Sequence, residues 1–296
     1  MPESNSQTPT PGGAARLGES TVARIGFGVM QLERRAPSRE AALAMLTAAA
    51  DAGINHLDTA AFYGDCNELI MEALGARRDG VVLATKVGAA RNAAGDLVPG
   101  QKPEELRRQV EDNLVSLGTD HLEVVNLRRL DHAPGIRAEG DQVVDIDLQL
   151  AELAALRDAG TIGAIGLSNV STQQLEHSLP AGIACVQNLY NVLERDSAPV
   201  LEACRQNGVA WVPYCPLGSA FPGREKVTDD PTVQAVAAEL GATPAQVGLA
   251  WLLAEYEDTL LIAGTSGPAH LAENIAAGDL RLPPEALEAL NRIASG

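Results

Sequence analysis

The chain has 296 residues, of which 46% are hydrophobic and 21% charged, a composition typical of a soluble globular protein. No apolar run approaches the ~20 residues that a membrane-spanning helix needs, which excludes an integral membrane protein of helical type. Acidic residues outnumber basic ones by 39 to 22, for a formal net charge of −17. Because no Lys/Arg cluster interrupts this charge, we expect neither nucleic acid nor a membrane surface as a partner.

The first 15 residues, MPESNSQTPTPGGAA, contain too few apolar side chains to bury themselves. We therefore expect a flexible tail over residues 1–15 and a folded domain over residues 16–296. No signal-peptide pattern occurs in this segment, and the cysteines lack CxxC spacing. This pattern predicts a cytoplasmic protein with reduced thiols; the four cysteines are Cys66, Cys185, Cys204 and Cys215.

Short apolar runs alternate with segments of helical periodicity from about residue 22 onward. In one such segment Leu106, Val110, Leu114 and Leu117 recur at the spacing of an amphipathic helix. A second apolar stripe of this kind begins at Ile146. The eight runs predicted to be strands are Ile25–Gly28, Ile54–Asp58, Val81–Lys86, Leu122–Arg128, Ile162–Ser168, Ala184–Gln187, Val209–Tyr214 and Leu260–Ala263.

Strands that alternate with helices pair in parallel through right-handed crossovers. Eight such units favour a closed (β/α)₈ TIM barrel, of the α/β class, that forms a single domain. The alternative is an open, doubly wound sheet with a small second domain. No change of composition and no linker supports that alternative.

Reactive side chains stand where most of these predicted strands end. The active sites of barrel enzymes lie at the carboxyl ends of the strands, so the sequence predicts a functional site there. The residues concerned are Asp58, Lys86, Arg128 with Arg129, Ser168 with Asn169, Gln187 with Asn188, and Tyr214.

Asp58, Tyr63 and Lys86 form a candidate proton-donating unit. A phenol is a poor acid at neutral pH unless a nearby cation stabilises its phenolate. Lys86 can supply that cation, and Asp58 can hold the ammonium in place. Taken singly, Asp58 is also compatible with a helix cap, Tyr63 with a surface aromatic and Lys86 with a solvated strand end.

Six motifs, in order, resemble those of the aldo-keto reductase superfamily. They are GINHLDTAAFYG, VVLATKVG, GAIGLSNVS, VQNLYN, VPYCPLG and IAGTSGPAHLAENIAA. The resemblance implies an NADPH-linked carbonyl reductase on a (β/α)₈ barrel without a Rossmann domain. In agreement with this, the dinucleotide fingerprint GxGxxG is missing, since Gly26-Phe27-Gly28 continues as Val29-Met30-Gln31.

The resemblance assigns Asp58, Tyr63 and Lys86 to three positions of the catalytic tetrad. The fourth, usually a histidine at the end of strand four, is Arg128 in this chain. Arginine keeps a donor and stays charged, so it can orient or polarise a carbonyl, but it cannot act as a neutral imidazole. The alternative is that Arg128 pairs with a carboxylate or the cofactor and takes no part in the chemistry.

The resemblance also implies a cofactor site. Ser168 and Asn169 with Gln187 would bind the nicotinamide carboxamide, and Tyr214 would stack on the ring unless it is a core residue. The helix opened by Gly264, Thr265 and Ser266 suits the phosphate end. Further implied cofactor contacts are Gly28, Asp58, Pro216, Leu217, Gly218, His270, Glu273 and Asn274.

Two positions weaken the preference for NADPH. Many relatives carry Lys and Arg where this chain has Gly264 and His270, and those cations favour the 2′-phosphate. We expect NADPH, with NADH as the alternative, and for His270 an exposed helix residue as the alternative to a phosphate contact.

The motifs GVMQL, VVNLR and GTSGPAHLAEN look most like the pyridoxal reductase branch, which implies reduction of pyridoxal to pyridoxine. The alternatives are reduction of a sugar or polyketide ketone and, in another class, a non-catalytic NADPH-binding subunit. With five histidines and no HxH spacing, no metal site is expected. Substrate choice is expected to depend on the loops Arg91–Gly100, Asp131–Asp145 and Gly218–Asp230. We expect a monomer or weak homo-oligomer.

Overall fold

The computed structural model describes residues 10–218 and 224–293. Its main sheet has seven parallel strands in the spatial order β11-β10-β9-β8-β5-β4-β3. All seven lie within, or within one residue of, the runs predicted from the sequence. The strands are β3 (Phe27–Gly28), β4 (His56–Asp58), β5 (Val82–Val87), β8 (Leu122–Arg128), β9 (Ile162–Ser168), β10 (Ile183–Gln187) and β11 (Ala210–Trp211).

The eighth predicted run closes the sheet into a barrel. Leu261 forms a parallel bridge with Ile25 beside β3, and Thr259 forms one with Trp211 of β11. Backbone hydrogen bonds connect both edges, from Gly26 N–H to Leu261 O and from Leu260 N–H to Trp211 O, each 2.8 Å long. The segment thus joins the first strand to the last, which confirms the (β/α)₈ barrel.

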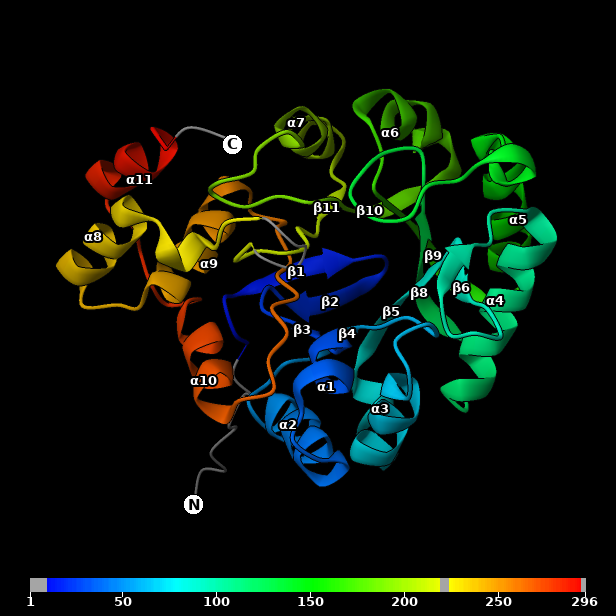
Figure 1. Cartoon of the computed structure of the whole chain (residues 1–296), viewed down its shortest axis with the longest axis horizontal. Coiled ribbons are helices and arrows are strands. Elements are labelled where there is room, and N and C mark those ends of the chain that lie inside the picture. The colour runs from blue at the N-terminus through cyan, green and yellow to red at the C-terminus, as the bar shows by residue number, and fades with distance from the viewer. Residues whose placement is uncertain (1–9, 219–223, 294–296) are drawn as a thin grey trace, which may run out of the picture.

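Helices surround the strands as a ring (Figure 1). The predicted amphipathic helix is α4, which begins at Pro103. The Glu105 carboxylate accepts from Lys102 N–H at 3.0 Å at its start, and Leu106 and Val110 are buried against the sheet. The helices are α1 (Met30–Arg35), α2 (Arg39–Asp51), α3 (Cys66–Leu74), α4 (Pro103–Ser116), α5 (Ile146–Asp158), α6 (Thr172–Ser178), α7 (Ala198–Asn207), α8 (Pro231–Leu240), α9 (Pro244–Glu255), α10 (Pro268–Ala276) and α11 (Pro284–Asn291), with 3₁₀ turns η1 (Gly75–Gly80), η2 (Gly140–Gln142), η3 (Leu179–Ala181) and η4 (Val227–Asp229).

Within the described residues, no single helix is long and apolar enough to cross a membrane. Helices α8 and α9 together reach the required length and composition but meet at 94°. Seven residues of α9 are buried, as in the core helix of a globular protein.

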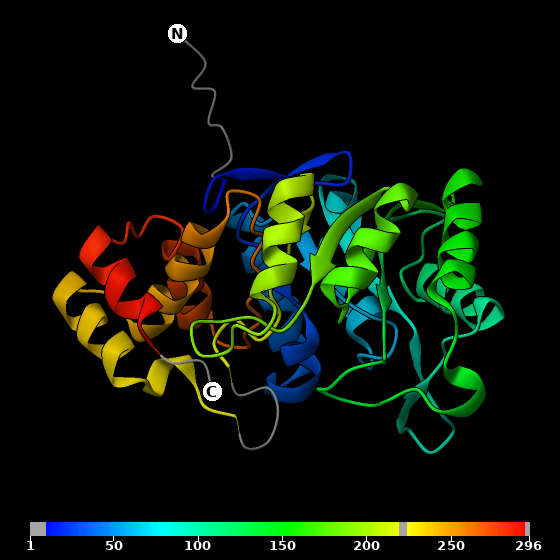
Figure 2. The ribbon, with the colours of Figure 1, turned by 90° about the horizontal axis from the view of Figure 1, so that it is seen from above.

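An antiparallel hairpin, β1 (Ala14–Leu17) and β2 (Ser20–Ala23), crosses one end of the barrel (Figures 1 and 2). Its inward side chains Ala15, Leu17 and Val22 cluster with residues of the barrel interior and are buried. The tail boundary expected at residue 15 is therefore wrong, because these apolar side chains cover the floor of the barrel. Residues 1–9 of the expected tail lie outside the described residues.

A second hairpin, β6 (Ala89–Arg91) and β7 (Leu97–Pro99), follows β5. It includes most of the segment from Arg91 to Gly100, which is one of the predicted substrate loops. The hairpin stands beyond the carboxyl end of β5, next to the strand ends that carry the predicted site.

Strand register brings the predicted residues together. Gly28 on β3 pairs with Asp58 on β4, Arg128 on β8 pairs with Ser168 on β9, and Ser168 pairs in turn with Gln187 on β10. Because parallel strands end at the same edge, these residues form one layer at the carboxyl end of the barrel.

Candidate active site

Asp58 and Lys86 form a buried ion pair at the carboxyl ends of β4 and β5. Lys86 Nζ donates to Asp58 Oδ1 at 2.6 Å and to the carbonyl oxygen of Thr59 at 3.1 Å. The two residues are only 4% and 7% exposed. Burial acts to lower the pKa of Lys86, but the Asp58 carboxylate and then Tyr63 outweigh it and hold that pKa above its ordinary value. Lys86 is therefore a permanent cation inside the site.

Tyr63 lies beside this cation in the loop between β4 and α3. The Lys86 ammonium is 5.1 Å from the centroid of its ring, and the Tyr63 hydroxyl contributes to the raised pKa of Lys86. The ring also packs edge-on against Phe62, with 5.1 Å between centroids. The structure thus brings the three predicted catalytic residues together.

The two neighbouring arginines at the end of β8 have different surroundings. Arg129 is buried and engaged by the fold, since its guanidinium pairs with Asp131 at 2.8 Å and donates to Gln149. Arg128 is half-buried, and its guanidinium carbon lies 6.0 Å from the centroid of the Phe62 ring. Only Arg128 therefore has its charged group available at the predicted tetrad position.

Gln101 holds the backbone of Arg128. Its side-chain amide donates to the carbonyl oxygens of Gly88 and Arg128 at 2.6 and 2.9 Å, and so connects the ends of β5 and β8. Gln101 is 1% exposed and its own carbonyl oxygens accept from Gln149. Gln101 could not be predicted from the sequence, because a glutamine after a strand has no distinguishing spacing.

Beneath the catalytic layer, the barrel interior contains small and polar side chains in close contact. His56 occupies the space left by Gly26, where a Cβ atom would lie 2.0 Å from the His56 ring. The Cys185 thiol donates to Asn126 Oδ1 at 3.3 Å. Burial raises the pKa of Cys185 to about 12, so this thiol stays protonated.

Gln187 has one amide atom bonded and one left over. Its Nε2 donates to Asp58 Oδ2 at 2.6 Å, whereas its Oε1 is buried with no hydrogen-bond partner among the described residues. A buried acceptor without a partner is costly unless a ligand supplies a donor. Ser168, its register neighbour, is also buried, so the two predicted carboxamide contacts lie together.

Asn169, the third predicted carboxamide contact, has a left-handed backbone with φ of 60°. Its side-chain amide donates to the carbonyl oxygens of Arg129 and His132 at 3.2 and 3.0 Å. These bonds hold the loop after β8. Only the carbonyl oxygen of the Asn169 side chain is left for a ligand.

Tyr214 packs against the apolar interior cluster at the carboxyl end of β11. Burial raises the pKa of Tyr214 above its ordinary value, so the hydroxyl stays neutral. Further along the chain, the Leu217 side chain lies beside Gly248 of α9. Gly218 forms an isolated antiparallel β-bridge with Lys226. Pro216 is half-buried beside them, while residues 219–223 of the predicted substrate loop lie outside the described residues.

Gly28 and Gly264 are in close backbone contact. A Cβ atom on Gly264 would lie 2.2 Å from the carbonyl oxygen of Gly28, so the loop could not keep this path with lysine at position 264. Gln31 lies beside Gly264, and its Oε1 is a second buried acceptor without a partner in the described part of the chain. Gln31 was also missed from the sequence.

The predicted phosphate end lies at the start of α10. Thr265 is buried, and its hydroxyl accepts from Gly267 N–H at 3.1 Å. Asn274 is buried and donates to the carbonyl oxygen of Ala263 at 3.4 Å. The other predicted contacts are less enclosed, with Ser266 and Glu273 half-buried and His270 exposed.

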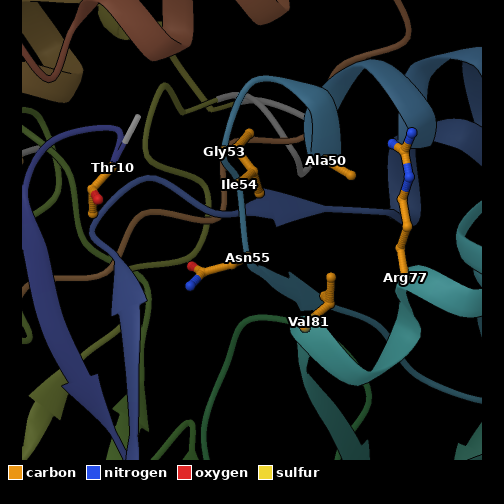
Figure 3. A pocket seen from close by; sticks show the side chains of 8 residues that line it. Thr10, Ala50, Gly53, Ile54, Asn55, Arg77 and Val81 are labelled. Atoms are coloured by element: carbon orange, nitrogen blue, oxygen red, sulfur yellow. The ribbon is translucent and has the colours of Figure 1, made fainter. Parts of the chain in front are cut away.

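Two cavities lie away from this layer, at the amino ends of the strands. The first, of about 310 Å³, is shown in Figure 3, and the second has about 340 Å³. Neither is lined by a predicted site residue. Among the described residues, no group of three or more His, Cys, Asp or Glu side chains could hold a metal ion. The first cavity is lined by Thr10, Ala50, Gly53, Ile54, Asn55, Arg77, Gly80 and Val81.

Comparison with known proteins agrees with the geometry. The profile of the Aldo/keto reductase family matches residues 24–295. Pyridoxine 4-dehydrogenase of Escherichia coli (strain K12) is 42% identical over 289 residues, which cover 94% of this chain and 97% of the relative. An uncharacterized oxidoreductase of Schizosaccharomyces pombe is 32% identical and covers 94% and 89% of the two chains.

Solved structures show the same likeness in three dimensions. The crystal structure of an aldo-keto reductase from Klebsiella pneumoniae in complex with NADPH superposes with a TM-score of 0.78 at 28% identity, over 95% of this chain and 94% of that one. The family match spans the barrel and the Asp58, Tyr63 and Lys86 site alike. The chain is an oxidoreductase and belongs to the aldo/keto reductase family.

Proposed function

We propose that the protein reduces an aldehyde to an alcohol with NADPH, and that pyridoxal, reduced to pyridoxine, is a substrate. The observation that carries the proposal is the buried Lys86–Asp58 pair beside Tyr63, which equips a phenol to donate a proton. The relative named pyridoxine 4-dehydrogenase, 42% identical over 94% of this chain, supports the choice of substrate.

The residues around the strand ends suit a nicotinamide cofactor. Gln187 Oε1 is a buried acceptor that lacks a donor, and a carboxamide N–H group would satisfy it. Ser168 lies beside Gln187, and Tyr214 offers a neutral ring at the same layer. When bound there, NADPH supplies the hydride that adds to the carbonyl carbon of the substrate.

Tyr63 transfers its hydroxyl proton to the carbonyl oxygen, so that the C=O bond becomes an alcohol. The phenolate left behind is stabilised by the Lys86 ammonium, which Asp58 holds in place. Arg128 donates to the same oxygen and meets the negative charge that develops on it. Tyr63 regains a proton from solvent before the next turnover.

The adenosine end favours NADPH through neutral donors rather than cations. Thr265, Ser266 and the start of α10 offer hydroxyl and backbone donors to a 2′-phosphate, and the His270 side chain lies on the first turn of this helix. The aldo-keto reductase from Klebsiella pneumoniae was crystallised with NADPH. A cytoplasmic location and a monomeric or weakly associated state remain part of this proposal.

The proposal is tested by following pyridoxal reduction by the purified protein, with the pyridoxine formed quantified by chromatography. NADPH and NADH are supplied in parallel at matched concentrations. We expect pyridoxine in amounts equal to the NADPH consumed, and slower turnover with NADH. NADPH binding without product across a panel of aldehydes would contradict the proposal and favour a non-catalytic NADPH-binding subunit.

A further inference from the structure

Arg128 has a charged group that the fold does not use. Within residues 10–218 and 224–293, no side chain or carbonyl oxygen accepts a hydrogen bond or forms an ion pair with its guanidinium. Other arginines that are not fully exposed are engaged. Arg78 pairs with Glu123 at 2.9 Å, Arg129 pairs with Asp131, and Arg24 donates to backbone carbonyls at 2.7 Å.

The fold nevertheless holds this guanidinium in one place. The Phe62 ring lies on one side, 6.0 Å away. Gly135 is also close, because a Cβ atom on it would lie 3.0 Å from Arg128 Nη2, and its φ is +103°. Gln101 fixes the Arg128 backbone. A positioned cation that the fold leaves without a hydrogen-bonding partner is available to a ligand.

The Phe62 ring beside the cation belongs to an apolar cluster. Ala60, Phe62 and Ala89 form a small buried cluster, and Tyr63, Leu97 and Ile136 pack against it. The cluster joins the catalytic tyrosine to the β6–β7 hairpin and to the loop after β8. This combination of an apolar wall and a free guanidinium fits a planar aromatic ring that carries an anionic oxygen.

We propose that Arg128 selects aromatic aldehydes with an ionised oxygen on the ring carbon adjacent to the one that bears the carbonyl. In such a molecule the two oxygens lie side by side in the ring plane, spaced for the parallel N–H groups of one guanidinium. One N–H then bonds the carbonyl oxygen that Tyr63 protonates, and the other bonds the neighbouring oxyanion. Arg128 is thus a specificity determinant as well as a polarising group.

This inference rests on the proposed function and names the substrate class of the same site. Pyridoxal is a member of the class, because its ring hydroxyl is adjacent to the aldehyde. A histidine at position 128 offers a single donor to the carbonyl oxygen, and a lysine offers a point charge without the fork. Neither reproduces recognition of two coplanar oxygens.

The test compares four aldehydes with NADPH: 2-hydroxybenzaldehyde, 4-hydroxybenzaldehyde, 2-methoxybenzaldehyde and benzaldehyde. The 4-hydroxy isomer has a similar electronic effect on the carbonyl, and the methoxy compound keeps an oxygen on the adjacent ring carbon but cannot ionise. Alcohol products are quantified by chromatography, because these aldehydes absorb near the NADPH band. We expect kcat/KM for the 2-hydroxy compound to exceed that of both controls by roughly tenfold or more.

The pH dependence provides a second readout. We expect KM for 2-hydroxybenzaldehyde to fall as the pH rises through the pKa of its phenol, while KM for 2-methoxybenzaldehyde stays level. In Arg128→Lys and Arg128→Met, the ratio of kcat/KM between the 2-hydroxy and 4-hydroxy isomers should fall to about 1, whatever the overall rate. Arg108→Met changes an exposed arginine on α4, away from the strand ends, and should leave the ratio unchanged.

The outcomes separate this inference from the proposed function. Reduction of pyridoxal without preference for the 2-hydroxy isomer, or with a preference that survives Arg128→Met, would overturn the inference and leave the function standing. The inference also fails if pyridoxal is reduced and none of the four aldehydes is. Failure with pyridoxal and every other aldehyde would overturn the proposed function itself.

Discussion

The ammonium of Lys86 lies 2.6 Å from the carboxylate of Asp58 in the closed interior of the barrel. Removing one member of a buried pair leaves the other charge without compensation, which costs roughly 3–5 kcal/mol. We therefore expect Lys86→Met to lower the free energy of unfolding by that amount and to abolish carbonyl reduction. Urea denaturation followed by circular dichroism measures the first effect.

The double variant Asp58→Asn/Lys86→Met serves as the matched control, because asparagine keeps an acceptor for Gln187 Nε2. Because it removes both charges, we expect it to recover most of the lost stability while remaining inactive. A double variant as unstable as Lys86→Met alone would mean that packing, rather than the unpaired carboxylate, accounts for the loss.

His56 should make the protein sensitive to mild acid. Burial lowers the pKa of His56 to about 4, against an ordinary value of 6.5. Between these two values the unfolded chain binds a proton that the folded chain does not, so stability falls as the pH decreases from about 6.5 to about 4. This lowering of the His56 pKa corresponds to a decrease of roughly 3 kcal/mol in the free energy of unfolding.

The measurement is the free energy of unfolding at several pH values in the wild type and in His56→Leu. We expect the decrease between pH 6.5 and pH 4 to be smaller in the variant by about that amount. Parallel curves for the two proteins would show that His56 is protonated in the folded state, contrary to this account.

Gly264 should be essential for cofactor affinity. A Cβ atom at this position would lie 2.2 Å from Gly28 O, so Gly264→Ala must displace the loop that leads into the proposed phosphate site. We expect the Kd for NADPH, measured by fluorescence titration, to rise about tenfold or more. Gly267→Ala is the control, because a Cβ atom there meets its nearest neighbour, His270 Nδ1, at 3.4 Å and should be tolerated.

Gln101 should act as a positioning residue for Arg128. Gln101→Met removes the amide that donates to Gly88 O and Arg128 O. Each buried carbonyl oxygen left without a donor lowers the free energy of unfolding by roughly 1–3 kcal/mol. The carboxyl end of β8 also loses the hydrogen bond that fixes it. We expect KM for pyridoxal to rise severalfold while the Kd for NADPH stays within about twofold. A rise in both constants together would indicate general loss of structure.

The barrel could be predicted from the sequence, because each strand and each helix is indicated by residues that lie close together in the chain. Apolar runs such as Leu122–Arg128 and the glycine-terminated helices between them already specify parallel strands in order. The chain positions of Asp58 and Lys86 at two such strand ends were enough to predict their proximity. The structure confirms this with the 2.6 Å ion pair.

The N-terminal hairpin was missed for a physical reason. Ala14–Leu17 and Ser20–Ala23 are each only four residues long and contain few large apolar side chains. Their signal was the alternation of Ala15, Leu17 and Val22 about the turn at Gly18. This weak pattern forms a hairpin because the barrel floor supplies an apolar surface that buries these side chains.

Some properties of the site depend on contacts far apart in the chain. Arg129 donates to Gln149, 20 residues away, as well as to nearby Asp131, whereas Arg128 has no hydrogen-bond or ion-pair partner among the described residues. The buried acceptor of Gln187 emerges only when its other amide atom is seen to bond Asp58. No motif spacing contains this information.

The most direct test of the account is single-turnover reduction of pyridoxal by Tyr63→Phe with NADPH already bound. We expect the Kd for NADPH to match the wild type within about twofold, because the ring remains, while the rate constant for reduction falls roughly 10²- to 10⁴-fold through loss of the proton donor. A variant that binds NADPH normally and reduces pyridoxal at the wild-type rate would contradict the assignment of Tyr63 as the acid of a carbonyl reductase.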